Sequence, residues 1–279
     1  MKKKTMFSLV LLFFSMSVWA EEAVEPQLVE IKCSIRPIDR SKIHPSGNYA
    51  TSQSTTSPTS QSSSSNWSGY VAATDLTGTS ANGTVSYVAG SWVVPTIKAS
   101  TDTTYCAIWV GIDGFLSDSV EQIGTSHNWV DGAQQNYAWF EMYPNGSYEI
   151  SGFPVDNGDV ISARVGYKGN DTFKLVISNL TKGVSTVIPS SNTMSTSALR
   201  SSAEWVVEAP YSGMILPLAD FKLVTLNYCS AVINGVSGTI NNGEWMNDEI
   251  VMETQKGIEA QPSALLKNGS CFQVAWQSE

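Results

Sequence analysis

Alternation of apolar and polar residues dominates the chain after about residue 65. In 161–167, Ile, Ala, Val and Tyr alternate with Ser, Arg and Gly, and the same period recurs in 173–178 and 272–276. A period of two is that of a strand with one buried and one solvated face. Turn dipeptides such as Asp131-Gly132 separate these runs. The sequence therefore predicts an all-β fold, an antiparallel β-sandwich or a barrel.

The N-terminus has the pattern of an export signal. A Lys run at 2–4 precedes an apolar stretch at 7–16, and Ala20 provides the small residue at which a signal peptidase cuts. The stretch is too short to span a bilayer, and no second apolar run of about 18 residues follows. We therefore expect 1–20 to be a signal peptide and the protein to be secreted without a membrane anchor. The periplasm is the alternative compartment.

Composition divides the exported part in two. The segment 51–65 has 12 Ser or Thr among its 15 residues and no charge. Such a segment buries too little apolar surface to fold and is typical of a flexible linker. Aromatic residues return at Trp67 and continue to the end. We expect 66–279 to be the folded domain and 21–65 to be a propeptide with a Ser/Thr-rich linker, with a tethered tail as the alternative.

Charge and histidine content exclude several classes of function. Lys and Arg total 16 against 25 Asp and Glu, a net charge of −9, so a polyanion such as nucleic acid would be repelled. The two histidines are His44 and His127, and only the second lies in the expected domain, which disfavours metal sites and Ser-His-Asp triads. Phosphate-binding and dinucleotide-binding motifs are absent. We expect no metal, no cofactor and a monomer.

The four cysteines are expected to have structural roles. Export permits disulfides. The chain has no Cys-x-x-Cys spacing, so the cysteines give no sign of a metal site. Cys229 and Cys271 both lie beside strand-like runs in the C-terminal part, which favours their pairing. Cys33 and Cys106 either pair or stay free.

Carboxyl and carboxamide side chains on strands are the remaining candidates for chemistry. Glu204 and Glu208 lie four residues apart in Ala-Glu-Trp-Val-Val-Glu and therefore share one face of a strand. Glu141 stands in the middle of an aromatic-rich strand, and Gln122 belongs to another strand-like run. Aromatic and carboxyl side chains together on solvated strand faces favour a substrate groove.

Six short sequence blocks follow one another through nearly all of 66–279: Asn66-Trp67-Ser68-Gly69, Trp92-Val93-Val94-Pro95, Trp109-Val110-Gly111-Ile112-Asp113-Gly114, Gln122-Ile123-Gly124, Ala138-Trp139-Phe140-Glu141-Met142-Tyr143-Pro144 and Ala203-Glu204-Trp205-Val206-Val207-Glu208. In content and in order, these blocks resemble the glutamic peptidases, the eqolisin family. The resemblance implies a propeptide and an acid endopeptidase acting on polypeptides. It also implies a sandwich of two curved antiparallel sheets like that of concanavalin.

The same resemblance implies the site. The family's catalytic Gln and Glu fall on Gln122 and Glu208, and the positions that line or support its groove fall on Trp67, Trp109, Asp113 and Glu141. This chain departs from the family at Glu121, where an apolar residue is usual, at Met142, where an aromatic one is usual, and in its cysteines. Strand alternation should direct Glu121 away from the face that carries Gln122.

A Gln and a Glu can together hydrolyse a peptide bond. A Glu with an ordinary pKa near about 4.3 is partly ionised in acid and can act first as a base and then as an acid. The amide of Gln122 can orient the water and stabilise the oxyanion. We further hypothesise that Arg36, Arg40 and Lys42 of the prosegment lie over the acidic groove until acidification releases them.

Two other functions remain open from the residues alone. A sandwich glycosidase would use Glu141 and Glu208 as a carboxyl pair about 5 Å apart. Its usual Glu-x-Asp-x-x-Glu strand is missing from this chain. A secreted, non-catalytic binding module is the second alternative, and it requires that Gln122 and Glu208 do not face each other.

Overall fold

The structure is a computed structural model that describes residues 29–30, 34–37, 49–50, 59–77, 79–188 and 198–278. The signal segment predicted at 1–20 lies outside these residues. The described part consists almost entirely of strands, with two short 3-10 helices, η1 (Thr79–Ala81) and η2 (Lys267–Gly269). No helix in this part is long and apolar enough to cross a membrane.

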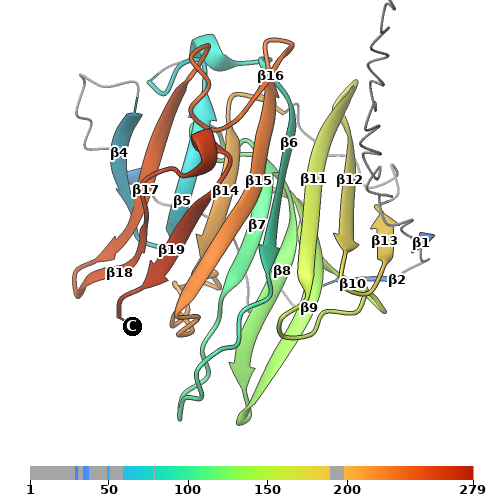
Figure 1. Cartoon of the computed structure of the whole chain (residues 1–279), viewed down its shortest axis with the longest axis vertical. Coiled ribbons are helices and arrows are strands. Elements are labelled where there is room, and N and C mark those ends of the chain that lie inside the picture. Colours follow the sequence, from blue (N-terminus) through green and yellow to red (C-terminus); the bar gives the residue numbers. More distant parts are fainter. Residues whose placement is uncertain are drawn as a thin grey trace, which may run out of the picture.

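The strands form two layers (Figure 1). The first layer, called the site sheet, contains in spatial order β2 (Ser34–Pro37), β10 (Ser147–Ser151), β9 (Ala133–Tyr143), β8 (Val120–Val130), β7 (Ala107–Ile112), β14 (Ala203–Glu208), β5 (Trp67–Ala73), β17 (Met246–Thr254), β4 (Thr59–Ser64) and β3 (Tyr49–Ala50). All neighbours in this sheet are antiparallel except β4 and β17.

The second layer, called the back sheet, contains β18 (Gly257–Pro262), β19 (Phe272–Trp276), β15 (Leu223–Ile233), β6 (Val85–Val93), β11 (Val160–Gly169), β12 (Thr172–Asn179), β13 (Val184–Val187) and β1 (Val29–Glu30), with β16 (Val236–Gly238) as a hairpin partner of β15. Strand β17 belongs to both layers, because its first half pairs with β5 and its end pairs with β18. The predicted all-β sandwich is confirmed, and the alternating runs are β11, β12 and β19.

The main core lies between the two layers. The site sheet contributes the odd-numbered residues of β8 and the even-numbered residues of β7, so that Ile108, Val110 and Ile123 are buried there. Trp92 and Phe272 of the back sheet pack into the same cluster. The opposite face of the site sheet therefore carries the other set of side chains, which includes the predicted catalytic ones.

The prediction of a flexible linker is wrong for Thr59–Ser64. These residues form β4, which pairs in parallel with six residues of β17. The hydroxyls of Ser60 and Ser62 donate to the two carboxylate oxygens of Asp248, which is buried. Hydroxyl groups that satisfy a buried carboxylate, together with backbone pairing, hold this segment where apolar side chains are lacking. The rest of the predicted linker, 51–58, lies outside the described residues.

The segment predicted to be a propeptide contributes short strands, β1, β2 and β3, at the edges of the two sheets. Strand β2 pairs with β10 at the outer edge of the site sheet and places Arg36 opposite Glu149 in register. Arg40 and Lys42 lie outside the described residues.

The described cysteines are buried free thiols. No bond joins Cys229 to Cys271 in the structure. Burial raises the pKa of Cys229, and the nearby thiol of Cys271 adds to the rise. Their predicted pairing therefore stays a prediction. Cys106 is also free, and Cys33 lies outside the described residues.

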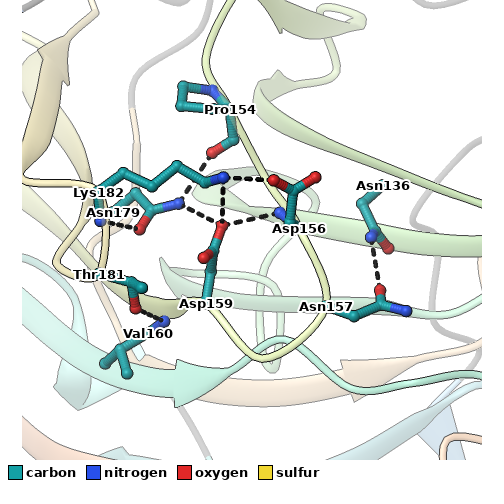
Figure 2. Close-up of polar contacts among 9 residues, drawn as sticks. All are labelled: Asn136, Pro154, Asp156, Asn157, Asp159, Val160, Asn179, Thr181 and Lys182. Carbon is teal, nitrogen blue, oxygen red and sulfur yellow. Dashed lines mark hydrogen bonds and ion pairs between the residues drawn. The ribbon is translucent and has the colours of Figure 1, made fainter.

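A polar network fastens the loop before β11 to its neighbours (Figure 2). The carboxylate of Asp159 accepts hydrogen bonds from the backbone of Asp156 at 2.8 Å and from Asn179 at 2.7 Å, and Lys182 bridges both acids. Asn157 of the same loop accepts from Asn136 of β9 at 2.8 Å. The loop is thus fixed to both sheets.

Asn136 also contacts the one histidine of the described part. The Nδ1 atom of His127 lies 3.0 Å from Oδ1 of Asn136, and its Nε2 atom lies 2.9 Å from the hydroxyl of Thr125. Burial lowers the pKa of His127 to about 4. This histidine faces the core side of β8 and takes no part in the face that carries Gln122.

Candidate active site

Glu208 is the last residue of β14, a strand with partners on both sides. Trp67 of β5 and Ala107 of β7 stand directly opposite it in register. The side chain is almost fully buried, at 2% exposure. Its Oε2 atom accepts a hydrogen bond from the indole of Trp109 at 2.7 Å, and Oε1 accepts one from the amide of Asn66 at 3.2 Å. The carboxyl group is therefore held by donors on both oxygens.

Two tryptophans form one wall beside this carboxyl group. The rings of Trp67 and Trp109 meet edge to face, with centroids 4.8 Å apart and an interplanar angle of 80°. Gly124 makes room for the second ring, because a β-carbon on that residue would lie 2.6 Å from Cβ of Trp109. The Gln-Ile-Gly block therefore supplies both a candidate catalytic side chain and the space that its neighbour needs.

Gln122 and Glu141 form a cross-strand pair on the same face. They stand opposite each other on β8 and β9, and Nε2 of Gln122 donates to Oε2 of Glu141 at 2.9 Å. Gln122 is fully buried, and its Oε1 atom has no hydrogen-bond partner. A buried amide oxygen without a partner costs free energy unless a water or substrate satisfies it. Glu141 thus orients the amide and leaves its oxygen available.

The Gln122 pair and the Glu208 cluster share one face but are offset. Gln122 is paired with Gly111 of β7, whereas Glu208 is paired with Ala107 of the same strand. The two side chains are thus two strands and four residues apart, and no hydrogen bond joins them directly within the described part. The ring of Trp109 extends beside both of them. Its Nε1 atom donates to Glu208, and a β-carbon on Gly111 would be 2.9 Å from its Cζ3 atom and 3.2 Å from Cβ of Gln122.

Burial governs the protonation of Glu208. Removal from water raises its pKa to about 8, and the indole N–H groups of Trp109 and Trp67 oppose this rise. The sequence predicted an ordinary carboxyl group that is partly ionised in acid. In the folded chain the group keeps its proton throughout the acid range, because the donors do not offset the loss of water.

Three further buried acids, Asp113, Glu121 and Glu204, are neighbours at the end of β7 remote from Glu208. Asp113 follows β7, and its carboxylate accepts hydrogen bonds from the backbone N–H groups of Arg200 and Ser201. It therefore anchors the segment that leads into β14 and does not join the Gln122 or Glu208 groups. Glu121 stands opposite the core residue Ile112 and is therefore directed to the core side, as alternation predicts, and burial raises its pKa. Glu204 shares the face of Glu208, is fully buried, and its pKa is likewise raised by burial.

Sequence reasoning missed Asn66 as a site residue. It lies in the first family-like block, but its contact with Glu208 joins residues 142 positions apart. The pairing of β5 with β14 creates this contact, and only the block itself gave a signal for it. In the described part, no group of three or more His, Cys, Asp or Glu side chains is arranged to hold a metal ion.

A pocket of about 400 Å³ lies elsewhere. It is lined by 215–218, 254–256 and Glu259, and none of the predicted site residues borders it. It therefore offers no support for the site.

Comparison with known proteins assigns the class. The family model described as Peptidase A4 matches residues 65–270. The chain belongs to this family, that of the glutamic peptidases, and is an enzyme that hydrolyses peptide bonds.

Two curated relatives are similar in sequence. Aspergillopepsin-2 from Aspergillus niger is 29% identical over 198 residues, which are 63% of this chain and 67% of that protein. Scytalidopepsin B from Scytalidium lignicola is 30% identical over 145 residues, 49% of this chain and 55% of that protein. The chain thus spans little more than half the length of the second relative.

Solved structures agree on the fold. Scytalido-glutamic peptidase, determined with a transition state analog inhibitor, superposes with a TM-score of 0.64 at 23% identity, over 76% of this chain and 98% of that one. Aspergilloglutamic peptidase from Aspergillus niger gives 0.56 at 26% identity, over 62% and 99%. The sandwich described above is therefore the fold of this family.

Proposed function

We propose that the protein is a secreted acid endopeptidase that uses Glu208 and Gln122 as a catalytic dyad. The observation that carries this proposal is one buried carboxyl group surrounded by N–H donors on the same face as a buried amide with an unpartnered oxygen. Membership of a peptidase family supplies the substrate class.

In the proposed reaction, a water molecule attacks the scissile carbonyl carbon between the two side chains. Glu208 begins protonated, so it has both an O–H donor and an acceptor oxygen. The acceptor oxygen takes a proton from the water as the C–O bond forms, and the O–H group gives its proton to the amine nitrogen as the C–N bond breaks. The carboxyl group ends in the protonation state in which it began.

Gln122 would serve this reaction with both ends of its amide. Its Oε1 atom accepts the second hydrogen of the water and so directs the attack. One hydrogen of Nε2 is used by Glu141. The other can donate to the carbonyl oxygen as negative charge develops there. Loss of one such donor typically lowers the rate about 100- to 1,000-fold.

The test is cleavage of a denatured protein from pH 2 to 9 in the presence of an aspartic-peptidase inhibitor. Wild type should be active in acid, and its kcat/KM should fall as pH rises through about 8, where Glu208 loses its proton. Glu208→Gln should be inactive. Glu253→Gln, which changes an exposed Glu on β17, should retain activity. Full activity of the folded Glu208→Gln protein would refute the dyad.

The glycosidase alternative finds no support in the geometry. Glu141 and Glu208 lie on strands three positions apart, which corresponds to about 14 Å between the strands. The two residues are also offset along the strands. A retaining pair needs its carboxyl groups about 5 Å apart. The binding-module alternative is set aside by family membership.

Export and zymogen control complete the proposal. The Lys-rich, apolar N-terminus supports secretion. The register of β2 supports a prosegment that lies along the site sheet, with Arg36 at the position opposite Glu149. If Arg36, Arg40 and Lys42 restrain the site, their joint replacement by Gln should accelerate activation at intermediate pH. An unchanged activation rate would refute this role.

A further inference from the structure

The hydrogen bond from Asn66 to Glu208 depends on a residue further upstream. The hydroxyl of Ser64 donates to Oδ1 of Asn66 at 3.3 Å and accepts the backbone N–H of Trp67 at 3.1 Å. Because Oδ1 is occupied by this donor, the NH₂ end of the Asn66 amide faces Oε1 of Glu208. Both Ser64 and Asn66 are buried. The chain of contacts therefore runs from Ser64 through Asn66 to the carboxyl group.

Ser64 is in turn fixed by β4. It is the last residue of that strand and stands opposite Met252 of β17. Asp248 anchors the other end of β4 by accepting the hydroxyls of Ser60 and Ser62. If the chain began at Asn66, Asp248 would lose both of these donors, and β17 would become an unpaired edge. Both changes are unfavourable.

We propose that Ser64 and Asn66 are positioning residues for Glu208 and that β4 stays in the active enzyme, so that maturation removes only chain N-terminal to Thr59. The proposal rests on the function proposed above. It means that the C-terminal end of the removed segment lies within the Ser/Thr-rich tract. The tract is then a structural part of the catalytic domain, in contrast to the linker that its composition suggests.

Substitutions test the positioning role. Ser64→Ala should lower kcat about tenfold with little change in KM, because the amide of Asn66 loses its fixed orientation. Ser64→Thr keeps the hydroxyl and should restore most of the rate. Asn66→Asp has nearly the same shape but replaces the donor by an acceptor, so kcat should fall further and the loss of activity near pH 8 should move upward.

A control and a spectroscopic measurement separate this role from simple stabilisation. Ser237→Ala removes an exposed hydroxyl on β16, in the back sheet, and should change neither kcat nor KM. The pKa of Glu208, followed by carbon NMR in the full chain, should rise in Asn66→Asp. A folded Asn66→Asp protein with unchanged kcat and unchanged Glu208 pKa would overturn the positioning role.

Protein mapping tests the retention of β4. Full-length wild type, acidified, should yield a mature enzyme whose N-terminus, found by mass spectrometry, lies at or before Thr59. Full-length Glu208→Gln treated with pepsin should yield a resistant fragment whose N-terminus also lies at or before Thr59. This result does not depend on the protein's own activity. A fully active enzyme or a stable fragment that begins after Ser64 would overturn the proposal. An inactive wild type whose fragment still retains β4 would refute only the proposed function.

Discussion

Replacement of Glu208 by Gln should stabilise the protein more as the pH rises. The pKa of Glu208 is about 8 in the folded chain and 4.5 in the unfolded one. Below 4.5 both states carry the proton, and the folded state has its full stability. Between the two values only the unfolded state loses the proton, so stability falls by about 1.4 kcal/mol per pH unit, or about 5 kcal/mol in all. Gln has no proton to lose, so the substituted chain lacks this decline.

The assay is urea unfolding followed by tryptophan fluorescence from pH 4 to 8.5. The protein with Glu208 and the Glu208→Gln variant should both carry Gln122→Met, which prevents self-digestion in acid. The two proteins then differ only at residue 208. The contribution of other buried acids, such as Glu121, cancels in the difference. We expect the free energy of unfolding of Glu208→Gln, relative to its reference, to grow by several kcal/mol over this range. A difference that stays flat would show that water reaches the carboxyl group and would refute the reasoning from burial.

Three further predictions concern the scaffold. Gly124→Ala should destabilise the protein by about 1–3 kcal/mol and reduce kcat/KM, measured by thermal unfolding and peptide cleavage, because the new methyl group would clash with a backbone oxygen of β7 and with Trp109. His127 has a pKa lowered from 6.5 to about 4 by burial, so stability should drop by about 3 kcal/mol as pH falls between these values, and His127→Gln should lack that drop in urea titrations. Cys229 and Cys271 should resist alkylation in exported, unfolded protein until a reductant is added, and reaction before reduction would show that they remain free thiols.

Much of the fold could be predicted because strand alternation is local. The period of two located β11, β12 and β19 without tertiary information. It also placed Glu121 and Gln122 on opposite faces of β8. The register confirms this, because Glu121 stands opposite the core residue Ile112 and Gln122 stands opposite Gly111. Patterns of this kind need only neighbouring residues, and these are visible in the sequence.

The features that escaped prediction depend on partners distant in the chain. The Ser-rich segment 59–64 has no apolar face. It forms a strand because its hydroxyls bind the buried carboxylate of Asp248 and its backbone pairs with β17. Asn66 contacts the candidate site only because β14 places Glu208 beside it. The raised pKa of Glu208 results from burial by several strands together. The composition of a segment shows how much apolar surface it can bury by itself. It does not show which hydrogen bonds and backbone pairings distant parts of the chain will make with it.

The contact between Asn66 and Glu208 also affects how the enzyme should be produced. Asn66-Trp67-Ser68 is an acceptor sequence for N-linked sugar. The nitrogen that would carry the sugar is the one that donates to the carboxyl group, in a position with no exposed surface. A eukaryotic host that attaches a glycan before folding would thus block the hydrogen bond and the packing around it. Bacterial expression, or Ser68→Ala in a yeast host, avoids that loss.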